Sequence, residues 1–167
     1  MNRRYFLSQS KILLAGLPLV ALTNNNGEPI YGHNNKRYTW NKNWLANNSI
    51  LPGVKDCHEM VFTSDKDIIL LTNDTRNNFI RISKNGKIKA AYGNDFPGGH
   101  GLTIGGAKGE EFLIVTDTER HQFYKTSLNG RIIQTWDYPV ESEKYAVKTS
   151  FIPTESVITE EGEIYIA

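Results

Sequence analysis

The 167-residue sequence has too little of several features to support some common functional classes. It contains a single cysteine, Cys57, so no disulfide can form within the chain. Its 19 basic and 18 acidic side chains leave a formal net charge of +1, without a basic stripe or an acidic tail. We therefore expect no nucleic-acid partner. Hydrophobic residues make up 39% of the chain, which is enough to build the core of about one domain.

The sequence also lacks an apolar run long enough to cross a bilayer. Its longest, residues 12–22, has 11 residues, whereas a membrane-spanning helix needs about 20. The run follows the adjacent Arg3 and Arg4 and resembles the core of a bacterial twin-arginine export signal. The resemblance implies that residues 1–23 are a signal or anchor segment and that the twin-arginine translocase is a partner during export. We expect a periplasmic or extracellular protein that touches the membrane only through this segment; the alternative is an N-terminal helix buried in the fold.

Residues 24–53 form a polar, asparagine-rich lead-in without a clear period. We interpret this segment as irregular or strand-like. It contains His33, which we expect to be a solvated loop residue rather than a metal ligand.

A repeat starts near residue 54 and dominates the rest of the chain. Two units align at a constant offset of 44 residues, and each holds four strand-sized runs. The matched positions include Thr72 with Thr116, Phe79 with Phe123, Asn85-Gly86 with Asn129-Gly130, and Tyr92 with Trp136. Self-similarity at this period is typical of β-propeller blades. We predict an all-β protein, a β-propeller with blades at about 54–94 and 95–137 and an incomplete blade at 151–167.

The number of units bears on the size of the whole protein. A closed propeller needs at least four blades, so we expect the chain to be the N-terminal part of a longer polypeptide, with completion of the ring by oligomerisation as the alternative. Within each unit, the Asn-Gly pairs at 85–86 and 129–130 predict two-residue hairpin turns of type I′. Residues 137–150 are interpreted as an inserted connection.

Three segments carry a resemblance to a known family. They are His-Gly-Leu-Thr-Ile at 100–104, Leu-Ile-Val-Thr-Asp at 113–117 and Ser-Leu-Asn-Gly-Arg-Ile at 127–132. They resemble the NHL repeat, and in particular the six-bladed propeller of bacterial relatives of peptidyl-α-hydroxyglycine α-amidating lyases. This resemblance implies lyase-like activity on a small or peptide-derived substrate. It also implies a divalent metal on the propeller axis, zinc or calcium, bound by histidines of the loops that open the blades.

His58 and His100 occupy the matching positions of the first two units. Neutral imidazole suits zinc, so we predict these two histidines as metal ligands; the alternative is that both hydrogen-bond to backbone groups. The matching residue of the third unit is Thr154, which leaves the adjacent Glu155 as a candidate third ligand.

The residues that would carry catalysis cannot be assigned from the sequence. The catalytic arginine and tyrosine of the family have no defensible counterparts among Arg76, Arg120 and Tyr124. A non-catalytic propeller that binds a small ligand or a protein is therefore the alternative function. Cys57 precedes His58, but neighbouring side chains on a strand point to opposite faces, so we expect a buried apolar cysteine rather than a catalytic thiol.

Overall fold

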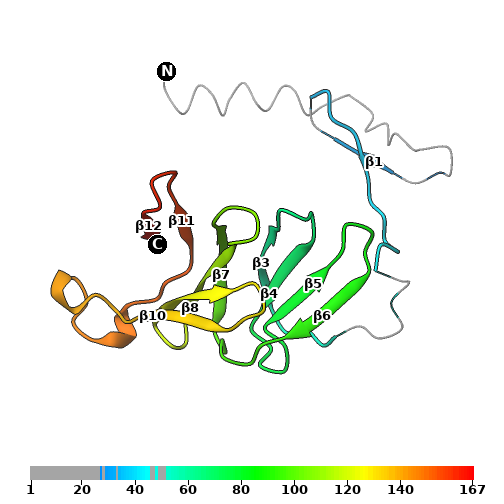
Figure 1. Cartoon of the computed structure of the whole chain (residues 1–167). Helices are drawn as coiled ribbons and strands as arrows, with labels where there is room; N and C mark the ends of the chain where they lie inside the picture. Colours follow the sequence, from blue (N-terminus) through cyan, green and yellow to red (C-terminus); the bar gives the residue numbers. More distant parts are fainter. Residues whose placement is uncertain (1–26, 28, 33, 46–47, 49–51) are drawn as a thin grey trace, which may run out of the picture. The chain divides into compact units, whose positions relative to one another are not determined.

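The computed structural model in Figure 1 describes residues 27, 29–32, 34–45, 48 and 52–167. The chain divides into two compact units, Met1–Lys42 and Asn43–Ala167. The predicted signal segment, residues 1–23, lies outside the described residues, and so does His33. The described part of the chain contains strands and two short 3₁₀ helices but no α-helix, which confirms the all-β class. Within the same residues, no helix has the length and apolarity needed to cross a membrane.

The first unit contains one short hairpin. Its two strands are β1 (Ile30–Tyr31) and β2 (Tyr38–Thr39), which pair antiparallel. The side chain of Arg37 closes the connection by donating to the carbonyl oxygens of Asn34 and Lys36 at 2.8 and 2.9 Å. The hairpin is therefore stabilised mainly by local contacts.

The second unit begins with a four-stranded antiparallel sheet. Its strands follow one another in space as they do in sequence, β3-β4-β5-β6. The predicted apolar run at 68–71 lies in β4, which pairs with β3 on one edge and β5 on the other. Its side chains are half-buried to fully buried, and Ile69 and Leu71 belong to the core between the two sheets. The strand bounds are β3 (Cys57–Phe62), β4 (Ile68–Thr72), β5 (Phe79–Ile82) and β6 (Ile88–Tyr92).

The second sheet repeats this arrangement. Its order, β7-β8-β9-β10, is again sequential and antiparallel. Its central strand β8 is almost wholly buried, as its apolar sequence predicts. The strand bounds are β7 (Gly99–Gly105), β8 (Phe112–Asp117), β9 (Gln122–Ser127) and β10 (Ile132–Trp136).

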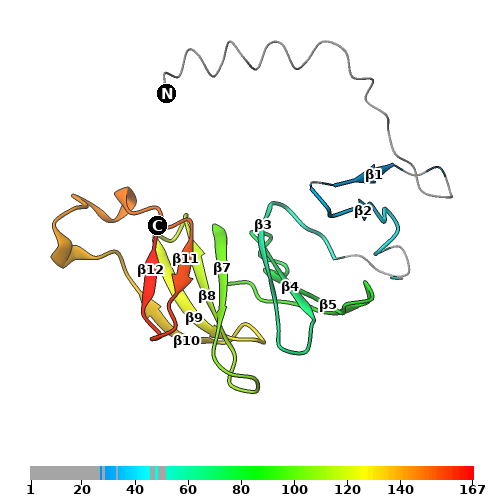
Figure 2. The same ribbon diagram turned by 90° about the horizontal axis from the view of Figure 1, so that it is seen from above.

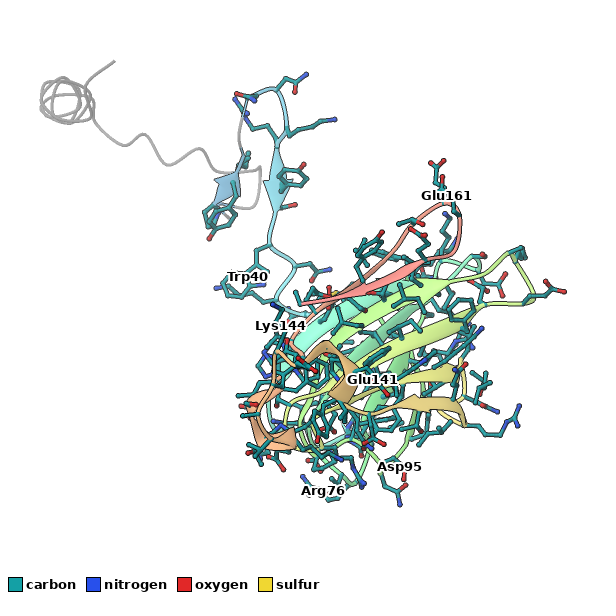
Figure 3. The ribbon with its side chains drawn as sticks, turned by 90° about the vertical axis from the view of Figure 1, so that its left-hand side faces the viewer. Trp40, Arg76, Asp95, Glu141, Lys144 and Glu161 are labelled. Carbon is teal, nitrogen blue, oxygen red and sulfur yellow. The ribbon has the colours of Figure 1, made fainter. Side chains whose placement is uncertain are left out.

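A two-stranded hairpin follows the second sheet. The connection that precedes it carries the 3₁₀ helices η1 (Val140–Ser142) and η2 (Lys148–Ser150), and the hairpin itself pairs β11 (Ser156–Ile158) with β12 (Ile164–Ile166). Figure 3 labels Glu161 on the hairpin turn, at the opposite end of the unit from Arg76. The third repeat unit therefore provides two antiparallel strands.

The hydrophobic core lies between the two four-stranded sheets. It consists of eight buried side chains that contact one another, Ile69, Leu71, Phe79, Phe96, Leu102, Leu113, Val115 and Tyr124. Phe96 belongs to the connection between the sheets and makes edge-to-face contacts with Phe79 and Tyr124, at centroid distances of 5.7 and 5.1 Å. Phe96 thus joins β5 of the first sheet to β9 of the second.

The predicted type I′ turns are wrong. Only the glycine of each pair has a positive φ, 79° at Gly86 and 82° at Gly130, whereas type I′ requires positive φ at both residues. Gly86 N–H donates to the carbonyl of Ser83, and Ser83 N–H donates to the carbonyl of Lys87. These bonds describe a three-residue loop that ends on a left-handed glycine, the second commonest hairpin connection. The sequence signal located the turns correctly but could not distinguish the two loop lengths.

Candidate functional site

The first strands of the three repeat units lie side by side, as Figure 2 shows. Leu102 N–H on β7 donates to the carboxylate of Glu59 on β3, at 2.9 Å. On the other side of β7, the hydroxyl of Thr103 donates to the carbonyl oxygen of Ser156 on β11, at 2.7 Å. Side chains at equivalent positions of these strands are thus brought to one place.

His58 and His100 both lie where the pairing of their strand is interrupted. The register of β3 with β4 shifts between Cys57 and Glu59, and that of β7 with β8 shifts between Gly99 and Leu102. Such bulges redirect side chains and are common beside functional sites. The bulge at each histidine therefore changes the direction of its side chain from the one that a regular strand would give.

The two imidazoles meet. Their ring centroids are 4.1 Å apart, with an angle of 19° between the planes, so that the rings are stacked. His100 is half-buried and His58 is exposed. The structure therefore brings together the two histidines that the sequence identified as equivalent.

The tautomer of His100 follows from its partner. Nδ1 lies 2.8 Å from the carbonyl oxygen of Thr154. Because a carbonyl can only accept a hydrogen bond, Nδ1 carries the proton, and the neutral ring keeps Nε2 as a lone-pair donor. A histidine that ligates a metal through one nitrogen usually donates the other N–H in this way. Thr154 thus contributes its backbone rather than a ligating side chain.

Two carboxyl groups stand beside the histidines. Glu59 is half-buried, and the negative charge of Glu155 from the third repeat unit acts on it. Burial, with a further contribution from the negative charge of Glu155, raises the pKa of Glu59 above its usual value, although the Leu102 N–H and His100 act in the opposite direction. Glu155 also accepts the N–H of Ser156 at 2.8 Å. Sequence reasoning identified Glu155 but missed Glu59, whose only signal was its place after His58.

The strand geometry leaves no room for a side chain at Gly101, the residue after His100. A Cβ there would stand 2.7 Å from the carbonyl oxygen of Thr154 and 2.8 Å from the hydroxyl of Thr116. Glycine therefore permits the close approach of β7 to the segment that leads into β11. This approach is what places the Thr154 carbonyl against His100.

The expectation of a buried Cys57 is wrong, since the residue is exposed. Partial desolvation and the nearby Asp56 raise the pKa of its thiol, which disfavours the nucleophilic thiolate. Cys57 therefore has neither the burial of a core residue nor the activation of a catalytic thiol.

The donor set suits a divalent metal in its chemistry. Two imidazoles with a carboxylate nearby are ligands that zinc accepts. Across the part of the chain that the structure describes, however, no three His, Cys, Asp or Glu side chains are already arranged to hold an ion. The described residues thus provide two stacked imidazoles, with the tautomer fixed at His100. To hold one ion, the rings would have to turn out of the stack and a third ligand would have to reorient.

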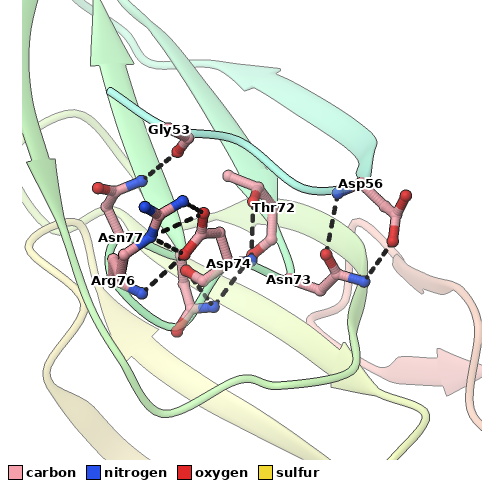
Figure 4. Close-up of polar contacts among 8 residues, drawn as sticks. Gly53, Asp56, Thr72, Asn73, Asp74, Arg76 and Asn77 are labelled. Atoms are coloured by element: carbon pink, nitrogen blue, oxygen red, sulfur yellow. Dashed lines mark hydrogen bonds and ion pairs between the residues drawn. The ribbon is translucent and has the colours of Figure 1, made fainter. Parts of the chain in front are cut away.

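A second polar cluster occupies the β4–β5 loop, shown in Figure 4. The guanidinium of Arg76 donates to Asp74 through Nε at 2.9 Å, and this side-chain hydrogen bond lowers the pKa of Asp74 to about 2. Asn77 donates to the carbonyl of Gly53 at 2.6 Å. Arg76 is thus engaged in holding its own loop, next to a surface groove of about 490 Å³ that Lys55 also lines.

Tyr124, a candidate from the sequence, and His121, which was not one, both have structural partners. Tyr124 packs in the core, and burial raises the pKa of its phenol to about 12. His121 has φ 57° and hydrogen-bonds through Nδ1 to the carbonyl of Phe151 at 2.8 Å, which ties the β8–β9 loop to the third unit.

Comparison of the sequence with known protein families and with curated proteins finds no family model and no curated protein that matches.

Proposed function

We propose that the two four-stranded sheets and the β11–β12 hairpin are consecutive blades of a β-propeller of the NHL type. The support is the constant offset of 44 residues, the sequential strand order in both sheets, and the contacts that join β3, β7 and β11. First strands that pack side by side line the central channel of a propeller. His58 and His100 would then face the axis.

We further propose that this axial position is a divalent metal site with His58 and His100 as ligands. One observation carries the proposal: equivalent bulges on two neighbouring strands stack the two imidazoles at 4.1 Å. The His100–Thr154 hydrogen bond supports it, because it fixes one ring as a donor through Nε2. A zinc ion bound there would polarise a hydroxyl group or activate water. The Thr154 carbonyl orients the ring of His100 and so its Nε2. The side chains of Glu59 and Thr103 hold the neighbouring strands together.

The activity that we propose is lyase-like, on a small or peptide-derived substrate, after the resemblance to amidating lyases. The alternative is a propeller that binds a ligand or protein without catalysis. Two observations favour the alternative: Arg76 is ion-paired with Asp74, and Tyr124 is buried in the core, so neither is free to act as a catalytic arginine or tyrosine. Turnover that disappears when either histidine is replaced would exclude the alternative.

Metal analysis of the purified protein tests the site. We expect about one equivalent of zinc in the wild type and its loss in a His58→Ala/His100→Ala double variant. His121→Ala is the matched control, because His121 also donates to a backbone carbonyl but lies in the β8–β9 loop. Wild-type protein that binds neither zinc nor calcium would refute the site.

Export through the twin-arginine pathway is part of the proposal and rests on the sequence of residues 1–23. Replacement of Arg3 and Arg4 by lysine should retain the protein in the cytoplasm, as followed by cell fractionation. Unchanged export of that variant would contradict the proposal.

A further inference from the structure

The contact between the two four-stranded sheets joins one particular face of each. Successive side chains of a strand point to opposite faces of its sheet. On the first sheet, Val61 and its cross-strand partner Ile69 point toward the second sheet and pack in the core. On the second sheet, Leu102 and Ile104 of β7 point back toward the first. Consecutive sheets therefore meet through two unlike faces.

The outer face of β3 repeats the face that the second sheet buries. Met60 matches Leu102 of β7, at the offset that relates the two histidines, and Phe62 matches Ile104 in the same way. Both alternate with Val61 along β3 and so point away from the second sheet. Leu102 is only 1% exposed, whereas Met60 and Phe62 are 56% and 63% exposed. We call these two side chains the β3 face.

The β11–β12 hairpin presents the opposite kind of face. Val157 on β11 pairs with Tyr165 on β12, as Val61 pairs with Ile69 in the first sheet. The side chain of Ser156, the residue before Val157, shares a hydrogen bond with a side chain of β7 at 2.7 Å. Val157 and Tyr165 therefore point away from the second sheet, and they are 56% and 57% exposed. We call them the β11–β12 face.

The two faces lie at opposite ends of the row of sheets. β3 and β11 contact β7 from its two sides, as Figure 2 shows. The contact between the first and second sheets already joins a face of the β3 kind to a face of the β11–β12 kind. Each end of the row is therefore complementary to the other end, and exposed apolar side chains of this sort mark an interaction surface.

We propose that the β3 face of one copy of this chain docks on the β11–β12 face of a second copy. This inference rests on the proposed stacking of the three units as blades and is independent of the metal site. A contact between unlike faces is head-to-tail and closes into a ring when the rotation permits. Two copies of three units give six, within the usual range of about 4–8 blades, whereas three copies give nine. We therefore expect a dimer with two such contacts.

Analytical ultracentrifugation of the full chain over a range of concentrations tests this dimer. Phe62→Lys places a charge on the β3 face, and Tyr165→Lys places one on the β11–β12 face. Both side chains are more than half exposed, so the core of one copy stays intact, and thermal unfolding at low concentration checks this. Ile133→Lys is the matched control, because Ile133 is 50% exposed on β10 and belongs to neither face.

We expect Phe62→Lys and Tyr165→Lys each to weaken dimerisation by at least about 10-fold, because docking would bury an unpaired charge. Ile133→Lys should leave it unchanged. An equimolar mixture of Phe62→Lys and Tyr165→Lys should dimerise more strongly than either variant alone, since one contact of the mixed dimer joins two wild-type faces.

Three results would overturn the inference. They are a wild-type chain that stays monomeric, association that neither lysine variant weakens, and loss of association in one variant alone without recovery in the mixture, which would mean that like faces meet. Zinc bound by a monomeric wild type would leave the proposed metal site standing. A dimer that follows the expected pattern but binds no zinc would support the inference while the metal site fails.

Discussion

The two four-stranded sheets contain the same aromatic pair in different surroundings. Phe79 on β5 stacks on Tyr92 of β6 at 5.4 Å, and Phe123 on β9 stacks on Trp136 of β10 at 4.8 Å. Phe79 is completely buried because the second sheet covers it. Phe123 is only half-buried and lines a pocket of about 600 Å³ with Tyr145 and other residues.

This comparison separates what one repeat unit specifies from what its neighbour supplies. The stacked pair itself is a cross-strand contact and forms in both sheets from the same spacing. Its burial depends on the element that packs next to it. Residues at equivalent positions of the two repeat units therefore contribute unequally to the free energy of unfolding.

The loops after β4 and β8 differ in a similar way. Asp74 follows β4 and is paired with Arg76, whereas Asp117 at the end of β8 is fully buried and accepts backbone N–H groups of Gly98, Glu119 and Arg120. Burial outweighs these hydrogen bonds and raises the pKa of Asp117. Two acidic residues that hold equivalent loops thus respond to pH in opposite directions.

Truncation of the two phenylalanines should have the largest effect. Phe79→Ala should lower the free energy of unfolding by about 3–5 kcal/mol, because it leaves a cavity between the sheets. Phe123→Ala should cost about 1–2 kcal/mol, since part of the ring is already in contact with water. Urea denaturation measures both. Equal costs would mean that the second sheet does not bury the first.

The turn glycines should give the next largest difference. Gly86 and Gly130 both need positive φ, so alanine should cost about 1–2 kcal/mol at each. A Cβ on Gly86 would also stand 2.0 Å from the carbonyl oxygen of Trp44, whereas on Gly130 its nearest neighbour is a ring atom of Tyr92 at 3.2 Å. We expect Gly86→Ala to be the more destabilising. Gly162→Ala, with nothing within 4 Å, isolates the backbone cost in the same thermal-unfolding series.

The two aspartates should give the smallest effect, visible as a dependence on pH. Arg76 lowers the pKa of Asp74 to about 2, so its stabilising contribution is present above its unfolded pKa near 4 and is lost as the pH falls toward 2. The difference in unfolding free energy between wild type and Asp74→Asn should therefore close at low pH.

Asp117 should behave in the opposite sense. Because its pKa is raised in the folded protein, Asp117 contributes to the free energy of unfolding in acid. This contribution is lost as the pH rises through that pKa. The difference in unfolding free energy between wild type and Asp117→Asn should therefore become smaller as the pH rises. Parallel curves for the two variants in urea denaturation at pH 2–7 would contradict this contrast.

Much of the fold was predictable from the sequence because its signals are local. The runs at 68–71 and 112–115 are strands because their apolar residues have no helical period, and Gly86 and Gly130 mark turns because a positive φ favours glycine. The loop length at these turns was not predictable, since Asn-Gly fits more than one hairpin type. The exposure of Cys57 was also missed, because it depends on which face of β3 is covered.

The sequence by itself determined the repeat, its strands and the equivalence of His58 and His100, since each follows from residue type and spacing. Only the tertiary structure decided that the two imidazoles touch, that the Thr154 carbonyl fixes the tautomer of His100, and that Glu59 accepts the N–H of Leu102 on the neighbouring strand. These contacts depend on two strand bulges and on the close approach, at Gly101, of the segment that leads into β11. Such features arise from packing between units that are distant in sequence, which no local pattern records.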